Sequence, residues 1–217
     1  SYMEAYNNPA GAAWVGASKQ ELQLILAGEQ PLSVEVVELN GVPYTKESFA
    51  TRDYYYNQNG VLEIIKVTKP IYENALAEAV KAYAKANEVD LKQSKTKDIN
   101  AGLESISRKY LDEGMTSYML GDLAGASVCF ENAVNASATA PLSKVDTTSL
   151  YNAGFTAWMV QDYERAKGFF ESCIENGYYH EDGDAFAKLA DTYGKLGDKE
   201  KMVAVLEKGF GLYPQSQ

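Results

Sequence analysis

The only histidine of the chain, His180, stands among side chains that could bind a metal ion, because Glu181, Asp182 and Asp184 follow it closely. Imidazole and carboxylate groups are common metal ligands, but one histidine with neighbouring loop carboxylates provides few fixed donors. Acidic residues at such a place also favour the start of a helix, where they face the positive end of the helix dipole. We therefore interpret them as solvent-facing residues, and we expect no metal ion and no other cofactor.

The sequence contains no catalytic motif. There is no glycine-rich phosphate loop, no Gly-x-Ser-x-Gly, no His-Glu-x-x-His and no Cys-x-x-Cys. Cys129 and Cys173 fall at helix-packing positions, so we interpret them as buried thiols, with a disulfide as the alternative. Since no nucleophile is paired with a base, no catalytic residue is predicted, and the sequence favours a protein that is not an enzyme.

Charge and hydropathy exclude two classes of partner. The 217 residues carry a net charge of −10, which disfavours nucleic acid and anionic membrane surfaces as partners. No run of eighteen apolar residues occurs, so no membrane-spanning helix is predicted. The chain begins at Ser1 rather than at a methionine, so its start does not indicate a compartment.

The elements that would position a site follow a repeated spacing. A small residue of one helix is followed, twelve residues later, by a packing position of the next: Gly114 and Ala126, Gly154 and Ala166, Ala190 and Met202. One turn further on stand Phe130, Phe170 and Leu206. Small residues let two helices cross closely, and the large residue fills the gap between neighbouring helix pairs. The recurrence is typical of a stacked array.

Turn residues separate the helices of each pair. Gly121-Asp122 and Gly197-Asp198 each combine a residue that ends a helix with one that caps the next. The whole pattern resembles the tetratricopeptide repeat, W-x2-L-G-x2-Y, then A-x3-F, then P. Glu113 and Met202 depart from it, because the pattern has an apolar residue and an alanine at these positions.

The resemblance implies a fold that is mostly α: a tetratricopeptide-like solenoid of antiparallel helix pairs with a small β insertion near the N-terminus. Residues 98–217 are predicted to form three repeats, at 98–140, 146–179 and 182–214. Residues 1–97 are predicted to form a degenerate first pair, with helices at about 10–27 and 70–87.

The insertion between these two helices covers about residues 33–69. Its first β-prone run, Val34 to Leu39, precedes Asn40-Gly41, which is a strong signal for a two-residue hairpin turn. A second turn is predicted at residues 57–60, between two further β-rich runs. Three or four strands are expected. A β-rich insertion of this kind resembles bacterial envelope tetratricopeptide proteins, so the periplasm or cell envelope is slightly favoured over the cytoplasm.

The resemblance also implies a groove, because the first helix of each repeat lines the concave face of such arrays. Its candidate binding residues are aromatic or apolar: Leu111, Met115, Tyr118, Met119, Tyr151, Phe155, Trp158 and Met159. The last repeat adds Asp184, Ala187, Asp191 and Lys195. Families that clamp a peptide's C-terminal carboxylate place lysine and asparagine where this chain has Leu111, Met115, Tyr151 and Phe155. Binding of chaperone tails is therefore disfavoured.

These features predict a non-enzymatic scaffold that binds a peptide or a partner protein through the concave face. Two alternatives for the groove stay open: the β insertion covers it, or a second copy covers it in a homo-oligomer. The alternative function is that of an accessory or ligand-binding component of a bacterial envelope complex, acting through the β insertion.

Overall fold

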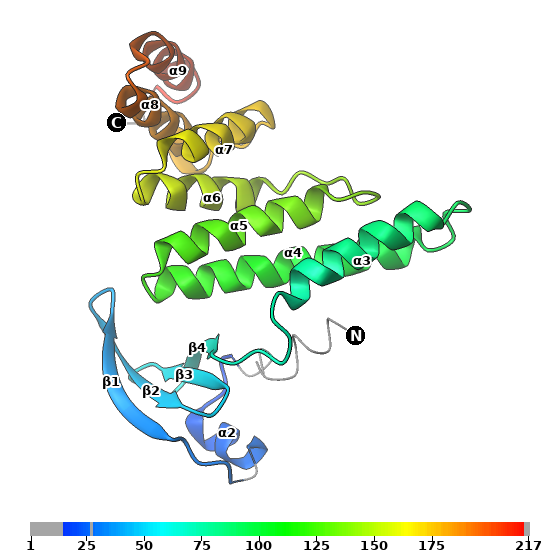
Figure 1. The fold of residues 1–217 in the computed structure, drawn as a ribbon. Helices are drawn as coiled ribbons and strands as arrows, with labels where there is room; N and C mark the ends of the chain where they lie inside the picture. Colours follow the sequence, from blue (N-terminus) through cyan, green and yellow to red (C-terminus); the bar gives the residue numbers. More distant parts are fainter. Residues whose placement is uncertain (1–14, 27, 215–217) are drawn as a thin grey trace. The chain divides into compact units, whose positions relative to one another are not determined.

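The computed structural model describes residues 15–26 and 28–214 and divides the chain into two compact units (Figure 1). The first unit takes the described residues up to Ala82 together with Met119–Gly121. The second takes Tyr83–Tyr118 and the described residues from Asp122 onward. The described residues form eight α-helices and one four-stranded sheet near the N-terminus, which confirms the predicted fold class.

The first unit is built on an antiparallel sheet in the order β1-β2-β3-β4. Its strands are β1 (Ser33–Leu39), β2 (Val42–Ser48), β3 (Arg52–Tyr56) and β4 (Leu62–Val67). Asn40 and Gly41 turn between β1 and β2 with φ angles of 53° and 80°. Positive φ at both central residues is what a two-residue hairpin requires, so the hairpin prediction is confirmed.

Helix α2 (Lys19–Ile25) is shorter than the helix predicted at about 10–27, of which residues 10–14 and 27 lie outside the described part. Ser18 is its N-cap and forms a reciprocal capping box with Glu21. Before it the chain is paired with the sheet: the Gly16 amide donates to the Leu62 carbonyl, and the Leu62 amide donates to the Ala17 carbonyl. The predicted helical conformation was wrong for residues 15–18, because β4 offers their backbone groups partners.

Helix α3 (Ala75–Val89) begins in the first unit and ends in the second. It starts later than the predicted residue 70, and Tyr72 lies before it. Asn74 has a φ of 57°, in the left-handed region that a right-handed helix cannot include. The helix therefore cannot extend back through Asn74.

The second unit continues as helix pairs joined by tight turns (Figure 1). The helices are α4 (Thr96–Met119), α5 (Leu123–Ala138), α6 (Thr147–Met159), α7 (Tyr163–Glu175), α8 (Asp184–Leu196) and α9 (Lys199–Leu212). The helix following each tight turn starts at an aspartate whose carboxylate accepts a backbone hydrogen bond, namely Asp122, Asp162 or Asp198. These caps satisfy amide groups that the first helical turn leaves without partners. None of the helices in the described part is both long and apolar enough to cross a bilayer.

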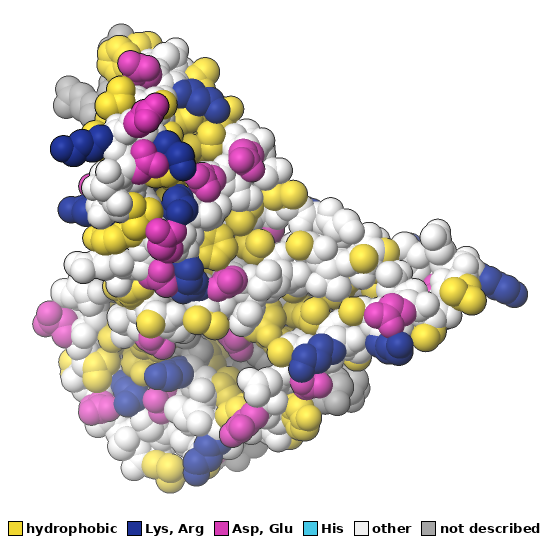
Figure 2. Space-filling model, turned by 45° about the horizontal axis from the view of Figure 1, so that its top comes forward, with side chains coloured by type: hydrophobic (Ala, Val, Ile, Leu, Met, Phe, Trp, Pro, Cys, Tyr) yellow, Lys and Arg dark blue, Asp and Glu magenta, His cyan; other side chains and the backbone are white. Residues whose placement is uncertain are grey.

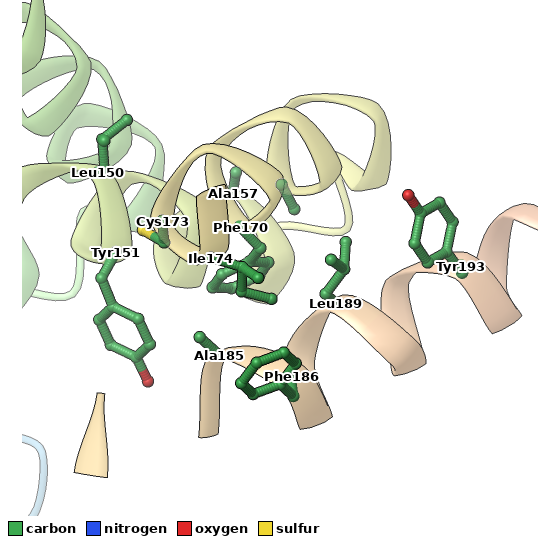
Figure 3. Close-up of a cluster of buried hydrophobic side chains, with 11 residues drawn as sticks. Leu150, Tyr151, Ala157, Phe170, Cys173, Ile174, Ala185, Phe186, Leu189 and Tyr193 are labelled. Atoms are coloured by element: carbon green, nitrogen blue, oxygen red, sulfur yellow. The ribbon is translucent and has the colours of Figure 1, made fainter. Parts of the chain in front are cut away.

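Small residues sit at the helix crossings, as the spacing predicted. A Cβ atom at Gly114 would lie 2.5 Å from the Phe130 ring, and one at Gly154 would lie 3.0 Å from the Phe170 ring. Phe170 belongs to a core cluster in which α7 packs against α6 and α8 (Figure 3). Leu206, at the position that corresponds to Phe170, is 47% exposed, because α9 is the last helix that the structure describes.

Candidate functional site

Four aromatic side chains of the second unit form a row of ring contacts. The centroids of Tyr118 on α4 and Phe155 on α6 lie 6.5 Å apart, and those of Phe155 and Tyr151 lie 6.2 Å apart in a stacked arrangement. Phe155 and Trp158 are also stacked, with centroids 6.2 Å apart. Since Tyr151, Phe155 and Trp158 lie on one stripe of α6, the helix geometry itself holds three members of the row in line. We call Tyr118, Tyr151, Phe155 and Trp158 the aromatic row.

Tyr151 is the buried member of the aromatic row, with 7% of its surface exposed. Its ring stacks on the His180 imidazole at a centroid distance of 3.8 Å, and its hydroxyl donates a hydrogen bond to the Asp184 carboxylate. Burial and the neighbouring Asp184 carboxylate raise the pKa of the Tyr151 hydroxyl. Tyr151, whose ring points away from α6 in Figure 3, therefore links α6 to His180 and to the first residue of α8.

Trp158 and Phe155 are half-buried and are held by charged side chains of α8. The Trp158 indole N–H donates to Asp191 at 2.7 Å. The Lys188 ammonium lies 4.4 Å from the Trp158 ring centroid and 5.6 Å from that of Phe155. A cation over an aromatic face is attracted by the negative potential of the ring. Asp191 and Lys188 thus orient the Trp158 ring, and Lys188 also lies near Phe155.

The α6 and α8 stripes share one spacing. Asp184, Lys188 and Asp191 follow each other at intervals of four and three residues, as do the three α6 rings. Sequence reasoning placed Asp184 and Asp191 in the groove but missed Lys188 and the stacking role of His180. The four-residue step from Asp184 was the signal for Lys188, whereas nothing in the sequence indicated which ring His180 would meet.

The other four predicted site residues take no part in these ring contacts. Leu111 packs, together with Tyr118, against the buried cluster that includes Phe130. Met115 and Met159 are 45% and 38% exposed. Met119 is partly buried in the first unit, where it packs against the cluster formed by Tyr44, Tyr55 and Ile64. The structure thus brings together four of the eight predicted residues in direct ring contact.

Residues 183–216 match the family model of the tetratricopeptide repeat. The chain contains a tetratricopeptide repeat. The matched segment overlaps the third predicted repeat, 182–214, and covers α8 and α9. The tetratricopeptide fold supports a role as a protein-interaction scaffold, and proteins of this kind are generally not enzymes.

Solved structures that match this chain include a point mutant of MamA, which is 16% identical over 63% of this chain and 93% of its own, with a TM-score of 0.42. MamA 41-end from Desulfovibrio magneticus RS-1 is 17% identical over 63% of this chain and 77% of its own, with a TM-score of 0.42. A putative kinesin light chain with nearly identical TPR-like repeats, from Podosopora anserina, is 12% identical over 67% of this chain and 79% of its own, with a TM-score of 0.38. A comparison with curated protein sequences found no match.

The surface of the protein mixes chemical types. On the face drawn in Figure 2, hydrophobic side chains lie among lysine, arginine, aspartate and glutamate side chains. Directly after Trp158 come two exposed residues, Met159 at the end of α6 and Val160 at its C-cap. Apolar side chains with a charged surround are the usual composition of a protein contact surface.

Cysteine chemistry does not contribute to this surface. Cys129 and Cys173 are both free thiols, and burial raises the pKa of each to about 12. A thiol with such a pKa is almost entirely protonated at neutral pH and is a poor nucleophile. No group of three or more metal-ligating side chains gathers within residues 15–26 and 28–214.

Proposed function

We propose that the chain is a non-enzymatic scaffold whose concave tetratricopeptide face binds a peptide or a partner protein through the aromatic row. The scaffold consists of the predicted repeats at 98–140, 146–179 and 182–214. The observation that carries the proposal is the unbroken series of ring contacts from Tyr118 through Phe155 to Trp158.

The fixed orientation of the rings supports this function. Rigid aromatic anchors bind at a low cost in conformational entropy, and buried tryptophan and tyrosine side chains commonly supply most of the affinity of an interface. Trp158 is oriented by Asp191 and Lys188 before binding, so it would lose little freedom when a partner packs on it. Tyr151 is itself buried and stacks on Phe155, so it limits the movement of the Phe155 ring.

The charged groups beside the row suggest how a partner would be selected. Lys188 lies between Asp184 and Asp191 along α8 and within 3.9 Å of an Asp184 oxygen. A partner that covers Phe155 and Trp158 would have to satisfy this ammonium group or leave it in contact with water. Apolar partner side chains would therefore cover the rings, while polar or acidic ones would lie over Lys188.

A second candidate function acts through the first unit. The chain would then be an accessory or ligand-binding component of a bacterial envelope complex. The observation in favour is a cavity of about 230 Å³ between α2 and the sheet, lined in part by the buried Glu47. Both candidate functions include a bacterial, periplasmic setting as part of the proposal. In a homo-oligomer, a second copy of the chain would cover the concave face instead of a different partner.

A pull-down from the native cell, followed by titration of the purified captured protein, tests the scaffold proposal. Trp158→Ala should weaken binding by about 30-fold or more, the equivalent of the roughly 2 kcal/mol that defines a binding hot spot. Phe210→Ala is the matched control, because Phe210 is a large exposed side chain of α9 outside the aromatic row. The control should bind as the native chain does.

Circular dichroism separates loss of binding from loss of structure. If Trp158→Ala instead lowers the melting temperature and leaves binding intact, the row stabilises the chain and is not a docking face. A variant with native melting and native affinity would move the search for the interaction site to the first unit.

A further inference from the structure

The first unit contains a cleft between α2 and the sheet, with a volume of about 230 Å³. Leu22 of α2 and Val34 of β1 give it apolar walls, and Phe49 and Tyr56 add two aromatic rings. Its charged lining residues are Lys19, Glu29 and Glu47. A cavity of this size suits a ligand of only a few heavy atoms.

Glu47 is the buried charge of the cleft, with 5% of its surface exposed. Its carboxylate forms an ion pair with the Lys19 ammonium, and burial together with this carboxylate raises the pKa of the Tyr56 hydroxyl. A buried carboxylate needs a cation beside it, because the low-dielectric surroundings disfavour an isolated charge. Whatever group neutralises Glu47 must therefore be a cation that reaches into the cleft.

The chain supplies such a cation itself. The Lys19 ammonium lies 5.7 Å from the centroid of the Tyr56 ring, so it meets a carboxylate and an aromatic face together. The Arg52 guanidinium repeats the arrangement, 4.7 Å from the Phe49 ring and 2.6 Å from a Glu29 oxygen. Both aromatic rings and both carboxylates that line the cleft thus already accommodate cations.

The two cations are held with unequal strength. Arg52 is buried, and it donates to the Tyr54 hydroxyl as well as to Glu29. The side chain of Lys19 is 39% exposed, and Glu47 is its ion-pair partner in the described residues. A lysine ammonium on a flexible four-carbon stem can turn into water by giving up only its contacts with Glu47 and the Tyr56 ring, whereas a guanidinium fixed at several points is harder to release. Lys19 is therefore the group that a ligand could replace.

We propose that this cleft is a binding site for a small organic cation with a primary ammonium group, which displaces the Lys19 ammonium from Glu47. The ligand's ammonium pairs with the Glu47 carboxylate over the Tyr56 ring, and its short hydrocarbon part lies against Leu22 and Val34. The inference deepens the second candidate function and does not depend on the aromatic row.

The charge of the cleft selects against other ligands. Once Lys19 turns to water, Glu29 and Glu47 line the cleft, and Arg52 neutralises only Glu29. An anion would meet the unpaired Glu47 carboxylate, and a neutral ligand would leave that carboxylate buried without a cation. A quaternary ammonium lacks the N–H donors that a hydrogen-bonded pair with a carboxylate requires. A primary ammonium carries the positive charge that the Glu47 carboxylate needs and the N–H groups that can donate hydrogen bonds to it.

The test is a titration of the full chain with n-butylammonium chloride, which carries the same alkylammonium group as a lysine side chain. Isothermal titration calorimetry should show saturable binding, with a rise in melting temperature. Sodium chloride and tetramethylammonium chloride at the same ionic strength are the controls and should produce neither effect. Absence of saturable binding to the native chain, or equal binding of tetramethylammonium, would overturn the proposal.

Three variants locate the binding. Glu47→Gln should abolish it, whereas Glu38→Gln, an exposed glutamate of β1, should leave it unchanged. Lys19→Ala removes the internal competitor, so it should tighten binding by on the order of tenfold, and the added amine should restore the melting temperature that the variant loses. If Lys19→Ala binds the amine but the native chain does not, the ion pair is purely structural and the proposal fails. Loss of amine binding with an intact partner interaction would leave the scaffold function standing.

Discussion

The two units handle charge in opposite ways. In the second unit, Asp184, Lys188 and Asp191 lie beside the aromatic row and hold its rings in place. In the first unit, Arg52 and Glu47 are themselves buried, and the Arg52 guanidinium lies over the rings of Phe49 and Tyr54. In the two proposals above, the rings of the second unit therefore contact a protein partner, whereas the Glu47 carboxylate of the first unit pairs with a small organic cation.

The hydrophobic cores of the two units also differ. The second unit repeats one packing arrangement, in which a phenylalanine of one helix packs against a glycine of the preceding helix: Phe130 against Gly114, and Phe170 against Gly154. The described core of the first unit has a different composition: Leu22 and three aromatic residues of the sheet region pack around Leu62. Equivalent core substitutions in different helix pairs should therefore have similar effects on stability, whereas effects in the first unit should depend on the individual residue.

The largest expected effect is loss of a repeated core phenylalanine. Phe170→Ala should destabilise the second unit by about 3–5 kcal/mol, because a fully buried ring is replaced by a cavity. Hydrogen exchange followed by mass spectrometry should show the greatest loss of protection in α6, α7 and α8. Equal loss throughout both units would contradict the separation of their cores.

Tyr151→Phe should cost about 1.5–3 kcal/mol, because the buried hydroxyl donates to the charged Asp184. It should also change the pH dependence of stability. Burial and Asp184 raise the pKa of Tyr151 above its usual value of 10.0, so the folded state holds this proton more tightly than the unfolded state does. The free energy of unfolding should therefore fall as the pH rises above 10, and it should fall less steeply in Tyr151→Phe. Denaturant unfolding of both proteins between pH 7 and pH 11 would detect the difference. Parallel plots of unfolding free energy against pH for the two proteins would contradict this prediction.

Gly154→Leu should destabilise the chain by about 1–3 kcal/mol, since even a Cβ atom there would press on the Phe170 ring. Gly168→Leu is the matched control on α7, where a Cβ atom has no neighbour within 4 Å. Thermal melting of both variants compares a crossing with an open helix surface. Similar melting temperatures for the two variants would contradict the position of Gly154 at the helix crossing.

The smallest expected effect compares one helix cap in each unit. Asp162→Ala, at the start of α7, and Ser18→Ala, at the start of α2, should each cost about 1 kcal/mol, because a side-chain acceptor for backbone N–H groups is lost. Denaturant unfolding monitored separately for each unit would measure both. A negligible cost for Ser18→Ala would show that pairing of residues 16–18 with the sheet, and not the capping box, fixes the start of α2.

The helix pairs could be predicted because the same residue types recur at the same spacing, so Gly154 and Phe170 could be compared with Gly114 and Phe130 along the chain. The strands could be predicted from local signals, above all Asn40-Gly41. The start of α2 could not, because it depends on backbone pairing between residues 16–17 and Leu62, which are far apart in sequence. The spacing on one helix predicted the line of Tyr151, Phe155 and Trp158.

Contacts between elements explain what sequence reasoning missed at the sites. The stacking of His180 on Tyr151 and the position of Lys188 over Trp158 depend on how α8 packs against α6. Met119 was predicted to join the groove because it follows Tyr118 directly, but the chain passes from one unit to the other between these two residues. The cleft around Glu47 had no sequence signal, because its charges come from α2 (Lys19), the segment between α2 and β1 (Glu29) and strand β2 (Glu47).

The most direct test of the scaffold function asks whether a partner covers Trp158. The chain has two tryptophans, so a Trp14→Phe background leaves Trp158 as the single tryptophan, whose emission can be followed separately from that of the tyrosines. Iodide quenching of its fluorescence should be measured with and without the purified partner obtained from the pull-down. Shielding by the partner predicts a clear fall in the quenching constant together with a shift of the emission maximum. An unchanged quenching constant at a partner concentration that saturates binding would contradict the claim that the aromatic row is the docking face.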